Sequence, residues 1–232
     1  MHATMQTLQP TRSFPSIVPH QPAAPDALDL LEQFGTTVAV QREHEIHGQG
    51  DPTEYCWRIL SGCVRTVKLM EDGRRQVADF RFGGDLLGLD DVGTHDFAAE
   101  AVTDVTLRRY PRRMVEALAD GHTALARRLR TMALADLRNA YERMVMLGRK
   151  TAVEKVAGFV LEMEQRATVP GRKLVEVPMS RTDVADHLGL TVETVCRILA
   201  HLKREGTVTL HRTGVEVLDR AALRAAACDA RH

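Results

Sequence analysis

Residues Met179–Gly206 read MSRTDVADHLGLTVETVCRILAHLKREG and carry the most specific pattern in the chain. Ser180 followed three residues later by Asp183 resembles a capping box, with aspartate in place of the usual glutamate or glutamine. It predicts a first helix over Arg181–Leu188. Gly189 permits the left-handed turn that ends this helix.

A second helix is predicted directly after the turn, over Val192–Lys203, with Thr191 as a good N-cap. Its apolar residues recur at helical spacing and form one face: Val195, Ile198, Leu199 and Leu202. The opposite face of its first turns holds Val192, Glu193, Cys196 and Arg197. Two short helices around a glycine-bearing turn, the second with a polar N-terminal face, predict a helix-turn-helix whose second helix enters the major groove of double-stranded DNA.

The residue types on that polar face suit base reading. Arginine donates two hydrogen bonds to guanine and glutamate accepts one from cytosine, so Arg197 and Glu193 together could read one G·C pair. Their spacing of four residues also predicts an ion pair between them. We expect Val192 and Cys196 to share in base reading. The expected phosphate contacts are Ser180, Arg181, Thr191, Thr194, Lys203, Arg204 and Arg212.

Two β-rich runs, Thr207–His211 and Val215–Leu218, follow around a short turn and predict a wing. Between Thr194 and Gly214 there are four basic residues and one acidic residue, a local net charge of +3. The whole chain has 31 basic and 31 acidic residues, so its attraction to DNA must be local.

Upstream of this region the apolar spacing is helical from Arg112, and neither proline nor glycine interrupts His122 to Leu147. Apolar residues there alternate at spacings of four and three, which is a heptad seam: Ala133, Leu137, Ala140, Met144 and Leu147. Such a seam usually packs against a twin helix, so we expect a homodimer. The alternative is a helix that packs only on its own chain. A further helix is predicted over Ala152–Arg166.

Residues 36 to about 109 consist of short apolar or alternating runs separated by glycine-bearing turns. The runs are Thr37–Gln41, Tyr55–Ser61, Cys63–Leu69, Arg75–Phe82, Phe97–Ala101 and Val105–Tyr110. Regularly spaced short strands predict an antiparallel β-roll. The first 26 residues hold five of the nine prolines and predict a disordered arm, followed by a short helix at Asp26–Phe34.

The predicted fold class is therefore α+β. Its parts are a disordered arm (1–26), a β-roll resembling a cyclic-nucleotide-binding jelly roll (27–111), a long dimerisation helix (112–148), a winged helix-turn-helix (149–222) and a C-terminal tail (223–232).

Several classes of protein do not fit the sequence. No apolar run is long enough to span a membrane and no secretory signal is present, so we expect a cytoplasmic protein. Only 4% of the residues are aromatic, which disfavours a stacking platform for single-stranded nucleic acid. The group His44, Glu45 and His47 departs from the spacing of β-barrel metal enzymes, so we expect no metal. No nucleophile–base pair or phosphate loop points to an enzyme.

The run LGLTVETVCRILAHLKREG at Leu188–Gly206 resembles the recognition motif of the CRP/FNR superfamily of bacterial transcription regulators, and the order of parts is similar over about residues 30–220. In that family the positions matching Glu193 and Arg197 read the G·C pair of a TTGA-type half-site. Val192 stands where cyclic-AMP-responsive members carry another base-reading arginine. The resemblance thus implies the FNR/FixK side of the family and a target like TTGAT-N4-ATCAA.

The family's two known sensors have no counterpart in this sequence. The cyclic-nucleotide cassette needs an arginine for the phosphate, and residues 84–100 contain none, so we expect no cyclic nucleotide. The arm has no cysteine for an iron–sulfur cluster, so we expect no cofactor. The FixK group lacks both sensors and generally activates genes for microoxic respiration, denitrification or nitrogen fixation. The alternative is an effector-gated regulator whose β-roll binds an unidentified small molecule.

Two further expectations concern single sites. Cys196 lies on the predicted DNA face, where oxidation would place negative charge beside phosphate and weaken binding. In the family, turns similar to Glu71–Arg75 touch RNA polymerase, which makes this turn a candidate activating patch.

Overall fold

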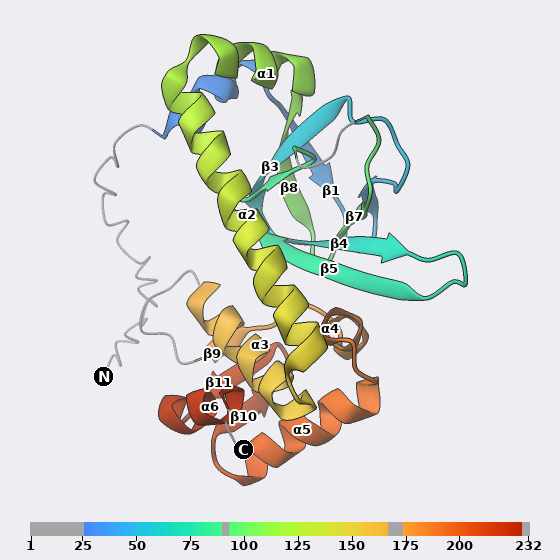
Figure 1. The fold of residues 1–232 in the computed structure, drawn as a ribbon, viewed down its shortest axis with the longest axis vertical. Helices are drawn as coiled ribbons and strands as arrows, with labels where there is room; N and C mark the ends of the chain where they lie inside the picture. Colours follow the sequence, from blue (N-terminus) through green and yellow to red (C-terminus); the bar gives the residue numbers. More distant parts are fainter. Residues whose placement is uncertain (1–25, 90–92, 167–173, 229–232) are drawn as a thin grey trace, which may run out of the picture.

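The computed structural model describes residues 26–89, 93–166 and 174–228. A β-sheet domain and a smaller helical domain are joined by one long helix, α2, which runs from the far end of the sheets to the helical domain (Figure 1). This is the α+β architecture that the sequence predicts. Residues 1–25 of the expected arm lie outside the described residues.

The β-roll consists of two four-stranded antiparallel sheets, with strand orders β1-β8-β3-β6 and β2-β7-β4-β5. Its strands are β1 (Thr36–Val40), β2 (Glu45–His47), β3 (Tyr55–Ser61), β4 (Cys63–Leu69), β5 (Arg75–Phe82), β6 (Leu86–Leu87), β7 (Ala98–Ala101) and β8 (Val105–Pro111). The predicted strands β3, β4 and β5 have the expected bounds. Strands β2 and β6 were not predicted, because two or three residues carry too little periodicity.

Helical elements cover the outer face of the first sheet. The 3₁₀ helix η1 (Ala27–Phe34), capped by Asp26, buries Leu28 and Leu31. These side chains form one apolar cluster with Cys56 and Tyr110 of the sheet and with residues of α1 (Arg112–Gly121) and α2 (Thr123–Arg149). The single helix expected over 112–148 is therefore two helices, because His122 takes an extended backbone (φ −128°, ψ 95°).

The C-terminal domain begins after Lys150, which is also extended. It contains α3 (Ala152–Arg166), β9 (Leu174–Glu176), α4 (Arg181–Leu188), α5 (Val192–Arg204), β10 (Val208–His211), β11 (Gly214–Val217) and α6 (Arg220–Ala227). The wing hairpin gains β9 as a third strand. The tail expected over 223–232 is wrong for its first residues, because Asp219 caps α6 and Leu223 and Ala227 are buried against the domain; residues 229–232 lie outside the described residues.

The two domains share a core. One buried apolar cluster includes Val67, Val77 and Phe80 of the β-roll together with residues of α3, α4 and α5, among them Phe159 and Leu188. Helix α4 packs directly against β5. The orientation of the helix-turn-helix is therefore fixed by burial against the roll as well as by the chain connection.

His187 lies at the centre of this interface. Its ring packs beside Phe80 and Phe159, with ring centroids 5.0 and 5.9 Å away. Nδ1 donates to the Val77 carbonyl at 3.2 Å, and Arg143 of α2 donates to the remaining ring nitrogen. Burial, with the positive charge of Arg143 as a second cause, lowers the pKa of His187 to about 3. The imidazole is therefore neutral in the folded protein.

The neutral His187 makes stability depend on pH. In the unfolded chain this histidine protonates below about pH 6.5, whereas the folded protein excludes the proton, so its stabilisation is complete above pH 6.5 and is lost as the pH falls. Between pH 7 and pH 5 we expect the free energy of unfolding to fall by about 2 kcal/mol more in the wild type than in His187→Gln. Urea unfolding at pH 7 and pH 5, at fixed protein concentration, measures how the free energy of unfolding changes with pH in both proteins. Equal changes in the two proteins would contradict this origin.

The four cysteines are free thiols. Cys56 and Cys63 are buried, and burial raises the pKa of each to about 12. Cys196 and Cys228 are exposed. Within 26–89, 93–166 and 174–228, no helix is long and apolar enough to cross a membrane. The same residues contain no group of three or more His, Cys, Asp or Glu that could hold a metal.

Candidate nucleic-acid interface

The capping box predicted at the start of α4 is present. The Ser180 hydroxyl accepts from the Asp183 backbone N–H at 3.0 Å, and the Asp183 carboxylate accepts from the Ser180 backbone N–H at 3.1 Å. Gly189 ends the helix in the left-handed region, with φ 61° and ψ 44°. This conformation costs glycine little, and it turns the chain directly into the next helix.

Helix α5 is amphipathic as expected. The Thr191 hydroxyl accepts from the Thr194 backbone N–H at 3.2 Å and caps the helix. The whole predicted apolar face is buried: Val195, Ile198, Leu199 and Leu202. The other face is turned to solvent, and Glu193, Cys196 and Arg197 are exposed on it while Val192 is half-buried. The structure thus places three of the four candidate base-reading side chains on one open surface.

The expected ion pair between Glu193 and Arg197 is absent from the described residues. Hydrogen bonds from its own backbone N–H and from the Thr191 hydroxyl lower the pKa of Glu193. The carboxylate is therefore ionised and directed back to the helix N-terminus, where unpaired N–H groups attract it. Arg197 keeps its guanidinium available to another acceptor.

Three further basic residues lie on the end of α5 and on the wing that follows it. Lys203 and Arg204 are exposed in the last turn of α5, and Arg212 is exposed at the tip of the β10–β11 hairpin. Among the described residues, no ion pair engages these three side chains or Arg197. Ser180 and Thr191 are exposed at the two helix N-termini, and Arg181 and Thr194 are half-buried. The domain therefore presents exposed positive charge on the end of α5 and on the wing, together with two exposed helix N-termini, and both features suit phosphate.

The wing is held by a close approach that only glycine allows. A Cβ built on Gly214 would lie 2.2 Å from the Val175 carbonyl oxygen of β9. Gly214 also pairs with His211 at the hairpin end, and the His211 Nε2 atom lies 3.1 Å from the Glu216 carboxylate. The sequence signals the hairpin but not β9, so it does not show this role of Gly214.

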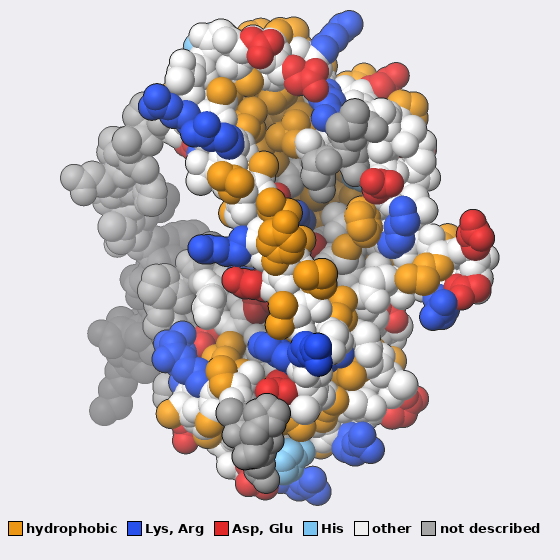
Figure 2. All heavy atoms as spheres, in the orientation of Figure 1, with side chains coloured by type: hydrophobic (Ala, Val, Ile, Leu, Met, Phe, Trp, Pro, Cys, Tyr) orange, Lys and Arg blue, Asp and Glu red, His pale blue; other side chains and the backbone are white. Residues whose placement is uncertain are grey.

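A stripe of apolar side chains runs along the exposed face of α2 (Figures 1 and 2). Its large members are Leu134, Leu137, Tyr141, Met144 and Val145, with 48–65% of each residue exposed. Of the predicted seam, Leu137 and Met144 belong to this stripe and Ala133 and Ala140 are exposed on its flank, whereas Leu147 is half-buried against the body. The exposed face is therefore rotated relative to the predicted seam, and the prediction missed Leu134, Tyr141 and Val145.

Described residues of the segment 84–100, which corresponds to the family's cyclic-nucleotide cassette, contact other parts of the protein. The Asp85 carboxylate accepts from the Phe82 backbone N–H at 2.9 Å, and Leu86 and Leu87 are buried. His95 is 1% exposed, and its ring stacks on His47 with centroids 3.7 Å apart. None of these groups offers the guanidinium that a cyclic phosphate would require.

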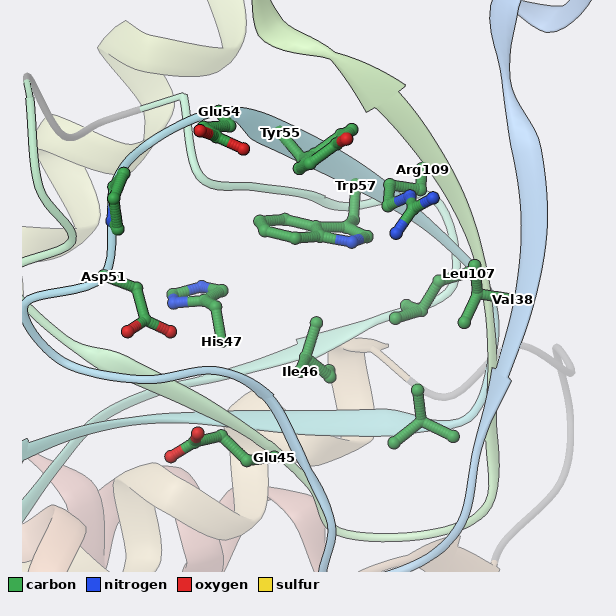
Figure 3. Close-up of a pocket in the computed structure, with 12 residues that line it drawn as sticks. Val38, Glu45, Ile46, His47, Asp51, Glu54, Tyr55, Trp57, Leu107 and Arg109 are labelled. Atoms are coloured by element: carbon green, nitrogen blue, oxygen red, sulfur yellow. The ribbon is translucent and has the colours of Figure 1, made fainter.

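A cavity of about 430 Å³ does open between β1, β8, β3 and the β2 region (Figure 3). Apolar side chains such as Ile46 and Leu107 line it, and Trp57 forms a flat aromatic wall. At its edge the Arg109 guanidinium stacks 4.5 Å from the centre of the Tyr55 ring. Size and lining suit a small organic molecule.

Comparison with known proteins gives the same two parts. Residues 37–122 match the cyclic nucleotide-binding domain family, and residues 154–226 match the Crp-like helix-turn-helix domain family. The chain is 36% identical over 206 residues to the nitrogen fixation regulation protein FixK of Bradyrhizobium diazoefficiens, covering 87% of each chain. It is 41% identical over 199 residues to FixK of Azorhizobium caulinodans, covering 84% of this chain and 80% of the relative.

Solved structures extend the likeness to the fold. FixK2 from Bradyrhizobium japonicum superposes with a TM-score of 0.78 at 39% identity, covering 82% of this chain and 96% of that chain. TTHB099, a CRP-family transcriptional regulator from Thermus thermophilus, gives a TM-score of 0.69 at 26% identity, with coverage of 82% and 96%. The matches include both domains and the helix between them.

Proposed function

This chain belongs to the FixK branch of the CRP/FNR superfamily of transcription regulators, which are not enzymes, and we propose that it reads a palindrome resembling TTGAT-N4-ATCAA as a homodimer. The observation that carries the proposal is the open face of α5. It presents Glu193 and Arg197 on a well-capped recognition helix, and no ion pair among the described residues engages Arg197 or the exposed Lys203, Arg204 and Arg212 of the same domain.

In the proposed complex the first turns of α5 lie in the major groove. Arg197 donates to guanine and Glu193 accepts from cytosine, and Val192 and Cys196 contact neighbouring bases. The phosphate contacts are those of the seven residues named above, from Ser180 to Arg212, and they position the protein without selecting sequence. A negative charge created by oxidation of Cys196 would then weaken binding.

The exposed stripe on α2 supports the homodimer. Contiguous apolar surface at heptad spacing is costly to leave in water and is typical of a helix that pairs with a twin. A two-fold dimer places the two recognition helices about 34 Å apart, one turn of DNA, which is the half-site spacing of a palindrome.

The relatives' names support a regulon in nitrogen fixation, and we propose activation of genes for microoxic respiration or nitrogen fixation in the cytoplasm. The β4–β5 turn is the proposed contact with RNA polymerase. Asp72 and Arg74 are exposed there and pair with each other at 2.7 Å. Arg75, by contrast, reaches the protein's own α4, so it is not available to the polymerase.

The direct test is binding of reduced, ligand-free protein to a duplex carrying TTGAT-N4-ATCAA and to one with its G·C pairs exchanged, at about 150 mM salt, because phosphate contacts are salt-dependent. We expect one dimer to bind the first duplex selectively. Equal binding to both duplexes would contradict the proposal.

The base-reading role of Arg197 has its own test. We expect Arg197→Ala to cost about 1–3 kcal/mol on the intact palindrome and almost nothing on the exchanged duplex. Lys203→Ala serves as the matched control, because the loss of one phosphate contact in each subunit should weaken both duplexes equally and reduce the salt slope of the dimer by about 2. Equal losses on both duplexes for Arg197→Ala would show that it contacts only phosphate.

The cavity in the β-roll favours one alternative, an effector-gated regulator of the same family. If a ligand in that cavity switches the dimer, the ligand-free protein should bind the palindrome weakly. Titration calorimetry with cyclic AMP and cyclic GMP, and a visible spectrum for haem or an iron–sulfur cluster, would reveal the commonest effectors. Tight binding by the ligand-free protein would exclude this alternative.

A further inference from the structure

A buried set of ion pairs joins the β-roll to the first helix of the helix-turn-helix. Arg65 of β4 is only 7% exposed and is surrounded by three carboxylates. Its Nε lies 2.7 Å from Glu100 of β7 and one Nη lies 2.7 Å from Glu43. The other Nη lies 3.2 Å from each carboxylate oxygen of Asp183 in α4.

A second arginine reaches the same helix from the neighbouring strand. Arg75 of β5 donates to Asp183 at 2.8 Å and to Asp186 at 2.7 and 2.9 Å. The Gln76 side-chain amide donates to the Asp186 carbonyl at the end of the same interface. We refer to Arg65, Arg75, Asp183 and Asp186 as the clasp.

Asp183 connects the clasp to the helix-turn-helix. The same carboxylate accepts from the Ser180 hydroxyl at 2.7 Å, and so completes the N-terminal cap of α4. Burial alone would raise its pKa, but the Ser180 hydrogen bond and the charges of Arg65 and Arg75 outweigh burial and lower it. An ionised aspartate, 2% exposed, thus belongs both to the start of α4 and to the surface of the roll.

The position of α4 determines the position of α5. The two helices contact each other across the Gly189 turn, and Val184 and Leu188 share a buried core with Val195 and Leu199. A movement of α4 on the roll would therefore carry the recognition helix with it. The clasp side chains are buried or half-buried and pair with one another, so they are not open to DNA.

We propose that Asp183 is the positioning residue of this regulator: held by Arg65 and Arg75, it fixes the recognition helix at the angle that matches two half-sites, without a bound effector. The inference rests on the proposed reading of a palindrome by a dimer. Buried ion pairs often add little net stability, but their directional contacts can select one geometry among several. An apolar interface alone would tolerate sliding, whereas these directional, charge-assisted hydrogen bonds would not.

The test varies the distance between half-sites. One added or removed base pair shifts the second half-site by about 3.4 Å and rotates it by about 35°. A rigidly positioned dimer should reject both changed duplexes, whereas a loosened dimer should tolerate them. The variants are Asp183→Asn, and Arg75→Gln and Asp186→Asn, which leave the α4 cap intact. Arg220→Gln is the matched control, because it breaks a 2.8 Å pair with Glu164 inside the DNA-binding domain.

We expect each clasp variant to bind the correctly spaced palindrome about tenfold more weakly than the control, within the 5–150-fold range typical of coupling between sites. Preference for the correct spacing should fall at least about fivefold, while affinity for a duplex with a single half-site stays within about twofold. Circular dichroism and sedimentation establish that each variant is folded and dimeric. If Asp183→Asn does not fold, the two half-buried variants decide the result.

The inference is overturned if the clasp variants keep the wild-type spacing preference, or if they weaken the single half-site as much as the palindrome. Selective binding by the wild type alongside either result leaves the proposed function in place. A wild-type protein that binds no duplex selectively overturns the proposed function, and this inference with it.

Discussion

Replacing Met144 with glutamate is expected to leave the protein monomeric and to weaken its binding to a palindrome by at least about 100-fold, the affinity that a second linked binding site usually adds. Met144 is 65% exposed on the apolar stripe of α2. In a two-fold dimer each substitution occurs twice, so two carboxylates would be buried without partners. Analytical ultracentrifugation measures the dissociation of the dimer, and binding to the palindrome measures the loss of paired recognition.

The control is a glutamate on the same helix but away from the stripe. At about 100° per residue, Ala135 points neither to the stripe nor to the β-roll, and it is exposed. Ala135→Glu adds the same charge and keeps the helix, so it should remain dimeric and bind normally. A dimeric Met144→Glu protein would mean that the stripe is not the dimer interface.

The difference between the predicted seam and the exposed stripe has a physical cause. Helix α2 has two apolar faces, and a heptad pattern does not show which face meets the body of its own chain. Met146 and Leu147 are half-buried toward the C-terminal domain. Arg143 also faces inward, to Asp79 and His187. A charged residue such as Arg143 can therefore lie on the inner face of the helix, whereas a rule based on apolar spacing places charged residues on the outer face.

Local signals were sufficient for most of the fold. Caps at Ser180 and Thr191, the turn at Gly189 and strict apolar spacing correctly predicted α4 and α5, because these signals act within one or two helical turns. Helix α6 could also have been predicted from the sequence, since Asp219 is a good cap before an alanine-rich run. Strand β9 could not, because its three residues acquire strand geometry only by pairing with β11.

The clasp could not be predicted from the sequence, for another reason. Arg65 and Asp183 are 118 residues apart, and nothing local connects them. The available signal was the presence of two basic residues, Arg65 and Lys68, inside the apolar run Cys63–Leu69, of which Arg65 is the one that the structure buries. Such a residue needs a partner, but the sequence does not identify the partner.

The second large effect is expected at Arg65. Replacement by methionine keeps most of the apolar stem but removes the guanidinium that Asp183, Glu100 and Glu43 share, so that Asp183 keeps only Arg75 as a cationic partner. We expect a loss of about 3 kcal/mol in the free energy of unfolding at pH 7, the lower end of the range for breaking a buried pair, because the buried Asp183 loses one of its two cations. For a chain of this size the loss corresponds to a fall in Tm of about 10 °C.

The matched control lies on the same hairpin. Arg74 pairs with Asp72 in solvent, with 76% and 53% of the two side chains exposed. Arg74→Met should change stability by less than about 1 kcal/mol, since exposed pairs contribute little. A similar loss of unfolding free energy in both variants would mean that the buried position of Arg65 does not increase the stabilising effect of its charge.

The pH dependence distinguishes an electrostatic loss from poor packing. The folded-state pKa of Asp183 lies below its ordinary value of 3.8, so the stabilisation from its charge is complete above that value and is lost as the pH falls through the folded-state pKa. The wild type loses this advantage in acid, and Arg65→Met, which lacks one of the two cations beside Asp183, has less of it to lose. The difference in unfolding free energy between the two proteins should therefore be largest near pH 7 and shrink below pH 4. A difference that stays constant with pH would assign the loss to packing, and Arg65 would then be a structural side chain whose charge has no role in holding α4.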